Sequence, residues 1–237
     1  MLVKKEYVDM VSKVYVDMVS KVSADDVERY INKNFDFATS LRIDIPDLSV
    51  KACLMTDDDN PLHQCDFYPQ IFNYGYDGDL GDDWVVDKNG REVNLLELMQ
   101  EQDEYESISE FLMNWFKENG YVFAGVKIME HSGVSVEVFN INDERLKDWW
   151  VNAFFYMKES ELKEYMGERE LTSDMLNAES KVWKNLGEEL EAWINGVLYA
   201  VTFESKWAYN AERFTSISDC AEFLASELNN AWDMANK

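Results

Sequence analysis

The sequence predicts an α+β fold in which several helices pack on an antiparallel sheet, preceded by an N-terminal helical segment. Two observations lead to this class. Some segments repeat apolar residues every three or four positions, as amphipathic helices do, and others are short, rich in β-branched and aromatic residues, and flank a tight turn, as strands do. A third is size: of 237 residues, 46% are hydrophobic and 14% aromatic. Such a chain buries a core, which a disordered acidic tail does not.

The first region, residues 1–40, is predicted to be helical. The octapeptide YVDMVSKV occupies residues 7–14 and again 15–22, and its apolar residues form one widening stripe if both copies lie in a single helix. Two interpretations of the duplication stay open: a replication slip tolerated in a terminal helix, or a helix that binds a partner or dimerises. Ser23, followed by two aspartates, is a typical helix N-cap and begins a second helix over 26–35.

The second region, residues 41–120, is predicted to be acidic and rich in aromatic residues, with helices. It opens with a strand over 41–45, where LRIDI alternates apolar and polar residues. Residues 56–90 are dense in turn formers, acids and aromatic residues, so we expect loops with little regular structure. Apolar residues at helical spacing then predict helices over 93–101 and 106–118.

The third region, residues 121–237, is predicted to be an α+β C-terminal region. It begins with strands over 121–130 and 133–139, joined by a tight turn at His131-Ser132-Gly133. The further predicted elements are a strand over 149–157, a short helix over 158–166, a long amphipathic helix over 173–195, a strand over 197–205 and a closing helix over 216–235.

Charge is the most unusual property of the chain, because 22 basic and 47 acidic side chains give a formal net charge of −25. The net charge is −1 for residues 1–40, −14 for 41–120 and −10 for 121–237. Phosphate binding depends on clustered Lys and Arg, so direct binding to nucleic acid or to an anionic membrane is not expected. The natural complement of this protein is a basic partner.

The sequence also predicts a location. It has no run of about 18 apolar residues and no apolar signal core, so we expect neither a membrane span nor a secretion signal, and a cytoplasmic location. Its three cysteines lack CxxC spacing. This pattern fits a reducing compartment and argues against a disulfide framework or a structural zinc site.

The aspartates interleaved with aromatic residues in the second region are predicted to form the partner-binding surface, with simple solvation of the chain as the alternative. A compact domain of this length is about 45 Å across, and duplex DNA of that length carries about 26 charges. Mimicry of nucleic acid is therefore possible if the acids lie on one face. The predicted partner-binding residues are Asp57, Asp58, Asp59, Asp66, Asp77, Asp79, Asp82, Asp83 and Asp87, and secondarily Glu101, Asp103, Glu104 and Glu106.

Few patterns in the chain indicate catalysis or metal binding. Residues 77–83, DGDLGDD, place oxygen ligands around glycines as calcium loops do, but Lys88 stands where such a loop has its closing bidentate Glu. His63 and His131 are the only histidines, and no GxGxxG, P-loop, GxSxG or HExxH motif occurs. We predict no enzyme, no metal site and no cofactor, and keep a metal-dependent enzyme using Asp77, Asp79 and Asp82 as a third alternative.

Parts of the C-terminal half match a recurrent pattern of strands and helices. An apolar strand ends in a His-Ser-Gly turn at 130–133, an aromatic strand contains Phe155-Tyr156, a Lys/Glu helix ends near glycine at 164–167, and NGVLY stands at 195–199. This arrangement, over about 80 residues, resembles a family of uncharacterised proteins from phages and mobile elements. The resemblance implies a mobile-element origin more than an activity.

Two segments depart from that family. Residues 140–144, NINDE, stand where the family has a Cys-Pro-Trp-Asp-Ser-Gly-like segment, and Lys206-Trp207-Ala208-Tyr209 replaces its Cys-Trp-Gly-Phe-Tyr-Gly ending. Any site built on those family residues is therefore not transferred to this chain.

Acidity and a mobile-element origin together predict an inhibitor of host defence in the host cytoplasm. An anti-CRISPR or anti-restriction protein can act as a DNA or RNA mimic that fills the basic channel of a CRISPR effector or restriction enzyme. The alternative is a non-mimic interaction module or regulator, using the N-terminal helix or exposed aromatic residues. Binding that weakens with salt and competes with nucleic acid distinguishes the mimic. The sequence makes no prediction of oligomeric state.

Overall fold

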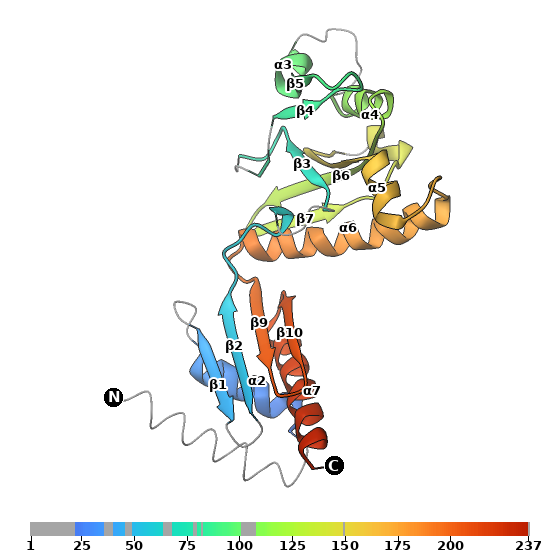
Figure 1. The fold of residues 1–237 in the computed structure, drawn as a ribbon. Coiled ribbons are helices and arrows are strands. Elements are labelled where there is room, and N and C mark those ends of the chain that lie inside the picture. The colour runs from blue at the N-terminus through green and yellow to red at the C-terminus, as the bar shows by residue number, and fades with distance from the viewer. Residues whose placement is uncertain are drawn as a thin grey trace. The chain divides into compact units, whose positions relative to one another are not determined.

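The structure of the protein is a computed structural model, and its residues form two compact units. The terminal unit combines Met1–Asp58 with Asn195–Lys237, and the inserted unit is the continuous segment Asp59–Ile194. Both contain helices and antiparallel sheets, which confirms the predicted α+β class (Figure 1). The structure describes residues 22–35, 40–45, 49–63, 68–77, 80–81, 83–100, 108–148 and 150–236.

The terminal unit is built on a four-stranded antiparallel sheet with the strand order β1-β2-β9-β10. Of the two central strands, β2 precedes the inserted unit in sequence and β9 follows it. They pair from Lys51 with Glu204 to Thr56 with Tyr199. The elements are α2 (Ala24–Asn34), β1 (Leu41–Ile45), β2 (Val50–Thr56), β9 (Tyr199–Glu204), β10 (Tyr209–Phe214) and α7 (Ile217–Ala235).

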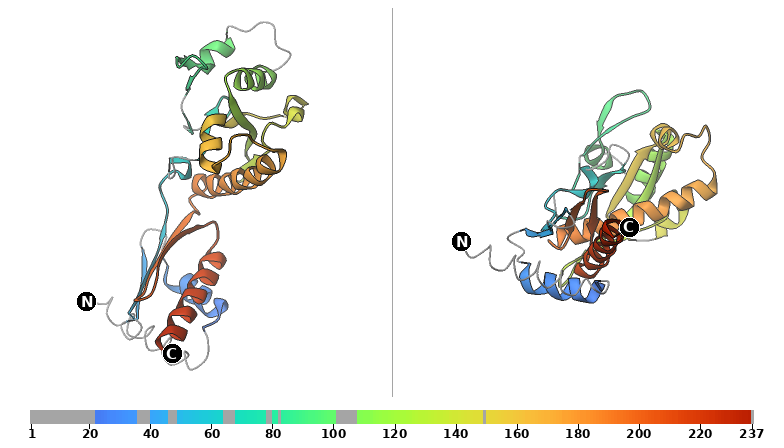
Figure 2. Two further views of the ribbon diagram at one scale, coloured as in Figure 1. Left: turned by 45° about the vertical axis from the view of Figure 1, so that its right-hand side comes forward. Right: turned by 60° about the horizontal axis from the view of Figure 1, so that its bottom comes forward.

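Helices α2 and α7 cover the same face of this sheet, as Figures 1 and 2 show. Strand β1 alternates buried Leu41, Ile43 and Ile45 with exposed residues, so its apolar side chains all face the helices. Helix α7 adds Leu224 and Leu228 to this core. The outer face of the sheet carries Arg42, Asp44 and Lys51, and also Met55, which is 40% exposed.

Serine caps fix where these two helices begin. The Ser23 hydroxyl accepts a hydrogen bond from the main-chain N–H of Asp26 at the start of α2. At the start of α7 the Ser216 hydroxyl accepts one from the N–H of Asp219. Each cap satisfies an N–H that the first turn of a helix leaves without a helical partner. The predicted helix starts at Ser23 and Ser216 are confirmed.

The inserted unit contains a second four-stranded antiparallel sheet, with the order β3-β8-β6-β7, and a small hairpin of β4 and β5. Its strands are β3 (Gln70–Asn73), β4 (Trp84–Val86), β5 (Glu92–Asn94), β6 (Tyr121–Glu130), β7 (Val134–Val138) and β8 (Ala153–Lys158). Its helices are η2 (Pro61–His63), α3 (Leu95–Gln100), α4 (Ile108–Glu118), η3 (Glu144–Asp148), α5 (Glu159–Met166) and α6 (Ser173–Ile194).

The central strands of this sheet are buried on both faces, because a different core covers each face. On one face Phe155 of β8 packs edge-on against the fully buried Trp183 of α6. On the other face its neighbour Tyr156 stacks on Phe116 of α4, with ring centroids 5.2 Å apart. Figure 2 shows the sheet between these two helices. The continuous apolar runs in β6 and β8 are the pattern expected of strands covered twice.

The two units do not follow the three consecutive regions 1–40, 41–120 and 121–237. The reason is the pairing of β2 with β9, which folds both ends of the chain together and leaves residues 59–194 as an insertion. The strand over Leu41–Ile45 and the hairpin of β6 and β7 are confirmed. The duplicated octapeptide lies outside the described residues except for Val22, the last residue of its second copy, which is buried.

Several short strands were not expected from the sequence. Residues 56–90 contain β3 and β4 where only loops were expected, and β2, β5 and β10 are further additions. In the helices predicted over 106–118 and 173–195, two large apolar side chains are exposed, Ile108 at 50% and Val182 at 43%. Ile108 is the first residue of α4, where the helix has only begun, and Val182 lies on the solvent side of α6 beside the buried Trp183.

Candidate functional site

The predicted partner-binding acids are divided between the two units. Asp57 and Asp58 belong to the terminal unit, and Asp59, Asp77, Asp83 and Asp87 belong to the inserted unit. A single face made from all of them would have to span both units, so this prediction stays open. The remaining predicted residues lie outside the described residues: Asp66, Asp79, Asp82, Glu101, Asp103, Glu104 and Glu106.

Asp57 forms an internal ion pair with Arg213. Its Oδ2 lies 2.6 Å from Nε of Arg213 in β10, and the two side chains are only 11% and 18% exposed. Its main-chain N–H donates to the carbonyl of Leu198 at 2.8 Å. A carboxylate engaged in this way is a poor candidate for binding a partner, because binding would require breaking an internal ion pair.

Asp87 also has a structural role. Its Oδ1 accepts hydrogen bonds from the main-chain N–H groups of Asn89 at 2.7 Å and Arg91 at 2.9 Å, closing the turn between β4 and β5. The hydrogen bond from Arg91 is the main cause that lowers the pKa of Asp87. Asp58, Asp59 and Asp77 are exposed, and they remain candidates for partner contact.

The division into units sharpens where the charge excess lies. The terminal unit has 11 basic and 17 acidic side chains, a net charge of −6 over 101 residues. The inserted unit has 11 basic and 30 acidic side chains, a net charge of −19 over 136 residues. Most of the negative charge therefore lies in the inserted unit, −12 in residues 59–120 and −7 in residues 121–194.

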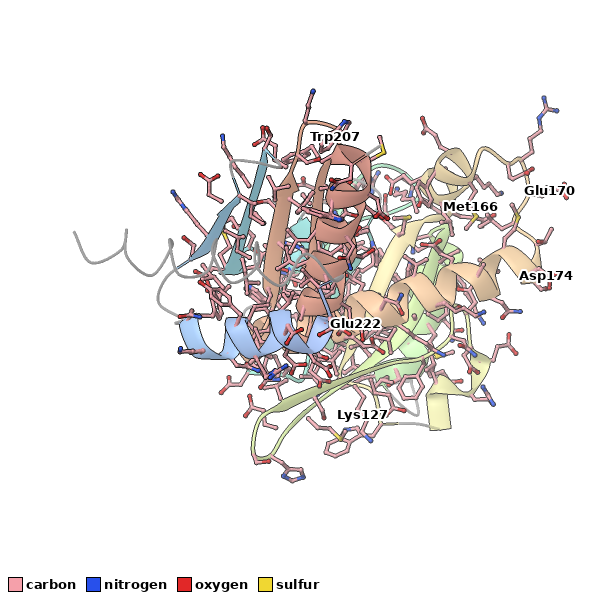
Figure 3. The ribbon with its side chains drawn as sticks, turned by 90° about the horizontal axis from the view of Figure 1, so that it is seen from below. Lys127, Met166, Glu170, Asp174, Trp207 and Glu222 are labelled. Atoms are coloured by element: carbon pink, nitrogen blue, oxygen red, sulfur yellow. The ribbon has the colours of Figure 1, made fainter. Side chains whose placement is uncertain are left out.

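Exposed carboxylates gather in sequence where α5 ends and α6 begins. Helix α5 stops at Gly167, whose positive φ of 68° is a conformation that glycine adopts without strain. Glu164, Glu168, Glu170 and Asp174 are all exposed around this connection. Figure 3 shows Glu170 and Asp174 projecting outward at one end of α6. None of these four was chosen from the sequence, because no motif marks them.

A pocket of about 300 Å³ lies in the inserted unit beside the β4–β5 hairpin. Trp84 stands at its rim with 52% of its surface exposed, whereas Tyr121 and Tyr156 are buried beneath it. Tyr121 donates a 2.6 Å hydrogen bond to the carbonyl of Val86, which ties the hairpin to β6. The pocket is lined by Tyr68, Gln70, Trp84, Val85, Val86, Tyr121, Tyr156, Met157, Lys158 and Glu161.

Charged groups of both signs enter this pocket. Lys158 pairs with Tyr121 across β8 and β6, and its Nζ lies 5.2 Å from the centroid of the Tyr121 ring. Burial is the main cause that raises the pKa of Tyr121 to about 12, and the negative charges of Glu161 and Asp87 raise it further. The tyrosine therefore stays protonated at neutral pH. Its side chain is acted on by two carboxylates, those of Glu161 and Asp87, and by one ammonium group, that of Lys158.

Neither a cluster of metal-ligating side chains nor a membrane-spanning helix is found in the part of the chain that the structure describes. There, no three His, Cys, Asp or Glu side chains come together as metal ligands. Of the three acids in the third alternative, only Asp77 is described, and it is exposed. Across the same residues no helix combines the length and apolarity needed to cross a bilayer.

No protein-family model, curated protein or solved structure matches this chain. The resemblance to phage and mobile-element proteins stays a prediction. The charge of the inserted unit and its pocket are the two structural observations from which a function is proposed below.

Proposed function

We propose that this protein binds a basic, nucleic-acid-binding surface of another protein through carboxylates of the inserted unit, and so keeps nucleic acid off that surface. The observation that supports this is the net charge of −19 on the inserted unit. Binding, and not catalysis, is the proposed activity. The proposed partner class is a host defence nuclease, either a CRISPR effector or a restriction enzyme, in the cytoplasm of the host cell.

A comparison of charge densities supports mimicry. A compact unit of this length has a radius of gyration of about 14 Å and a diameter of about 37 Å. Duplex DNA of that length carries about 22 phosphate charges. The inserted unit carries a net charge of −19. Its charge per length is thus close to that of the ligand it would replace.

The mechanism requires only complementary charge. A nuclease channel that binds phosphates presents Lys and Arg side chains, and exposed carboxylates such as Glu164 and Glu168 form ion pairs with them. Long-range attraction between the acidic unit and the channel also accelerates their encounter. Nucleic acid is then excluded because its binding surface is occupied.

Inhibition of DNA cleavage by purified nucleases tests this proposal. The probes are a guide-loaded Cas9-type nuclease and a type II restriction endonuclease, each with a plasmid substrate. We expect the protein to inhibit at least one, with relief by excess non-substrate duplex and a steep loss of inhibition as salt rises. Inhibition that does not change with salt concentration or with added duplex would instead favour the non-mimic module. Failure to inhibit either nuclease would overturn the proposed partner class.

A matched pair of variants tests the assignment to the inserted unit. The first combines Glu164→Gln, Glu168→Gln and Glu170→Gln, and the second combines Glu212→Gln, Glu222→Gln and Asp233→Asn in the terminal unit. Each removes three exposed charges. We expect the first to weaken inhibition at low salt by about tenfold or more and the second to leave it nearly unchanged. Equal effects would mean that net charge alone matters.

A further inference from the structure

The pocket beside the β4–β5 hairpin has the walls of a cation-binding site. Tyr68, Trp84 and Tyr121 all line it, and Trp84 is half exposed at the rim. The faces of Trp and Tyr rings carry partial negative charge and attract cations within about 6 Å of the ring centroid. A pocket that combines aromatic rings with the polar side chains of Gln70, Lys158 and Glu161 suits a ligand that is flat and positively charged.

A cation of the protein itself already lies against one of these rings. Lys158 Nζ is 5.2 Å from the Tyr121 centroid. Within the described part of the chain, no carboxylate lies at ion-pair distance from this ammonium group. Lys158 is half-buried, at the junction of β8 and α5. Its flexible side chain can therefore leave the ring and yield the position to another cation.

The carboxylates around Tyr121 outnumber the cations. Glu161 lies exposed on α5, three residues after Lys158, and its negative charge together with that of Asp87 acts on the Tyr121 hydroxyl. Asp87 is held in the β4–β5 turn, so Glu161 is the carboxylate free to reorient toward a ligand. Gln70 adds an exposed amide with a carbonyl acceptor to the lining.

Size and geometry favour a guanidinium group over an ammonium group. A volume of about 300 Å³ accepts a single long side chain and is at the lower end of small-ligand pockets. A guanidinium is planar, stacks on aromatic rings and offers five N–H donors in a fork that matches a carboxylate. An ammonium can neither stack nor bind a carboxylate through two parallel hydrogen bonds.

We propose that this pocket binds one arginine side chain of the basic partner, with the guanidinium stacked on Trp84, paired with Glu161, and taking the place of the Lys158 ammonium group. This inference rests on the proposed function and gives it a defined contact point. The net negative charge of the inserted unit would attract the partner. The pocket would then fix where the partner sits on this unit, because it accepts one particular arginine.

Binding of small arginine probes to the full chain tests the pocket directly. The probes are N-acetyl-arginine amide, its uncharged isostere N-acetyl-citrulline amide, and N-acetyl-lysine amide. The readout is the indole N–H resonance of Trp84, assigned with a Trp84→Phe variant. We expect a saturable shift with arginine, a weaker one with lysine and none with citrulline. Equal shifts with arginine and citrulline, or no arginine-dependent shift up to the solubility of the probe, would overturn the proposal.

Three variants separate the pocket from general acidity. Glu161→Gln should weaken binding of the arginine probe by about fivefold or more, and Lys158→Met, which removes the competing cation, should strengthen it by about the same factor. Glu188→Gln, at an exposed acid of α6 in the same unit, is the control and should change the affinity by less than about twofold. If Glu161→Gln and Glu188→Gln have the same effect, the pocket is not the site.

The nuclease assay distinguishes failure of this inference from failure of the proposed function. If Glu161→Gln and Trp84→Phe inhibit a nuclease as well as the original chain while the arginine probe does not bind, the proposed function stands and the pocket proposal falls. If the arginine probe binds with the expected variant effects but neither nuclease is inhibited, the pocket stands and the proposed partner class falls.

Discussion

The side chains of Asp57 and Arg213 form an ion pair between the end of β2 and the edge strand β10, with 2.6 Å between Asp57 Oδ2 and Arg213 Nε. The Asp57 N–H also bonds the Leu198 carbonyl just before β9. This main-chain hydrogen bond therefore joins the two points where the chain leaves and re-enters the terminal unit, whereas the ion pair ties the first of these points to β10. Asp57 was predicted from the sequence to bind a partner, and in the structure its carboxylate forms an ion pair within the terminal unit.

Removing the Asp57–Arg213 ion pair should destabilise the terminal unit. Arg213→Ala leaves the Asp57 carboxylate, which is only 11% exposed, without its cation. We expect a loss of about 2 kcal/mol in the free energy of unfolding, measured with urea. Arg29→Ala is the control, since it breaks an ion pair with Asp26 whose side chains are 76% and 58% exposed, and it should cost much less. Equal losses would show that burial does not strengthen the Asp57–Arg213 pair.

The buried carboxyl of Glu179 should make the stability of the inserted unit depend on pH. It is 5% exposed in α6 and accepts a 2.9 Å hydrogen bond from Trp183 Nε1. Burial raises its pKa, and the bond from Trp183 partly offsets this. Because the folded state then binds the proton more tightly than the unfolded state, the contribution of Glu179 is favourable below the unfolded pKa and is lost as pH rises through the folded pKa.

Glu179→Gln should therefore stabilise the protein at neutral pH relative to the original chain, and much less near pH 4. Each unit by which the pKa is raised corresponds to about 1.4 kcal/mol of this difference. The amide oxygen still accepts from Trp183. Thermal unfolding of both proteins across this pH range measures the effect, and a difference in stability that does not change with pH would contradict it.

Gly187 allows close packing of α6 on β7. A Cβ at this position would collide with Cγ2 of Val138, and Gly187 is buried. Alanine in place of helical glycine normally gains about 1 kcal/mol, whereas overpacking costs about 1 to 3 kcal/mol. We expect Gly187→Ala to lower the free energy of unfolding, and the double variant with Val138→Ala to be less destabilised than additivity requires. Strict additivity would mean that the two residues do not clash.

The described cysteines should differ sharply in reactivity. Cys220 in α7 is fully buried, and burial, helped by the charge of Asp219, raises the pKa of its thiol to about 12. Cys53 in β2 is half-buried on the outer face of its sheet. Iodoacetamide at mildly alkaline pH should modify Cys53 rapidly, and Cys220 only after unfolding, because the thiolate is the nucleophile. Peptide mass spectrometry gives the site of modification, and early labelling of Cys220 would contradict the burial.

The elements predicted best from the sequence are those with strong local signals. The serine caps and the apolar spacing of α2 and α7, and the tight turn between β6 and β7, depend on residues close together in the chain. Strand β10 was missed because YNAERF is an edge strand with few buried positions, and so lacks a clear alternation. Strand β2 is stabilised by pairing with β9, a contact that no local pattern reports.

The candidate site was harder to predict for the same reason. Net charge is visible in the sequence, but its assignment to the inserted unit depends on knowing that residues 59–194 fold together. The pocket combines Trp84, Tyr121 and Lys158 from segments that only the sheet pairing brings together. The one local signal was Trp84, an aromatic residue in an acidic, turn-rich stretch, whose ring is 52% exposed.

The insertion of residues 59–194 between β2 and β9 also bears on how the chain is made. During synthesis the inserted unit is complete before β9 leaves the ribosome, so it can fold while β1 and β2 still lack the strand that completes their sheet. The edge of β2 that later pairs with β9 is then exposed to other nascent chains. A highly charged inserted unit, folded early, would repel identical neighbours during that interval and lower the chance of aggregation.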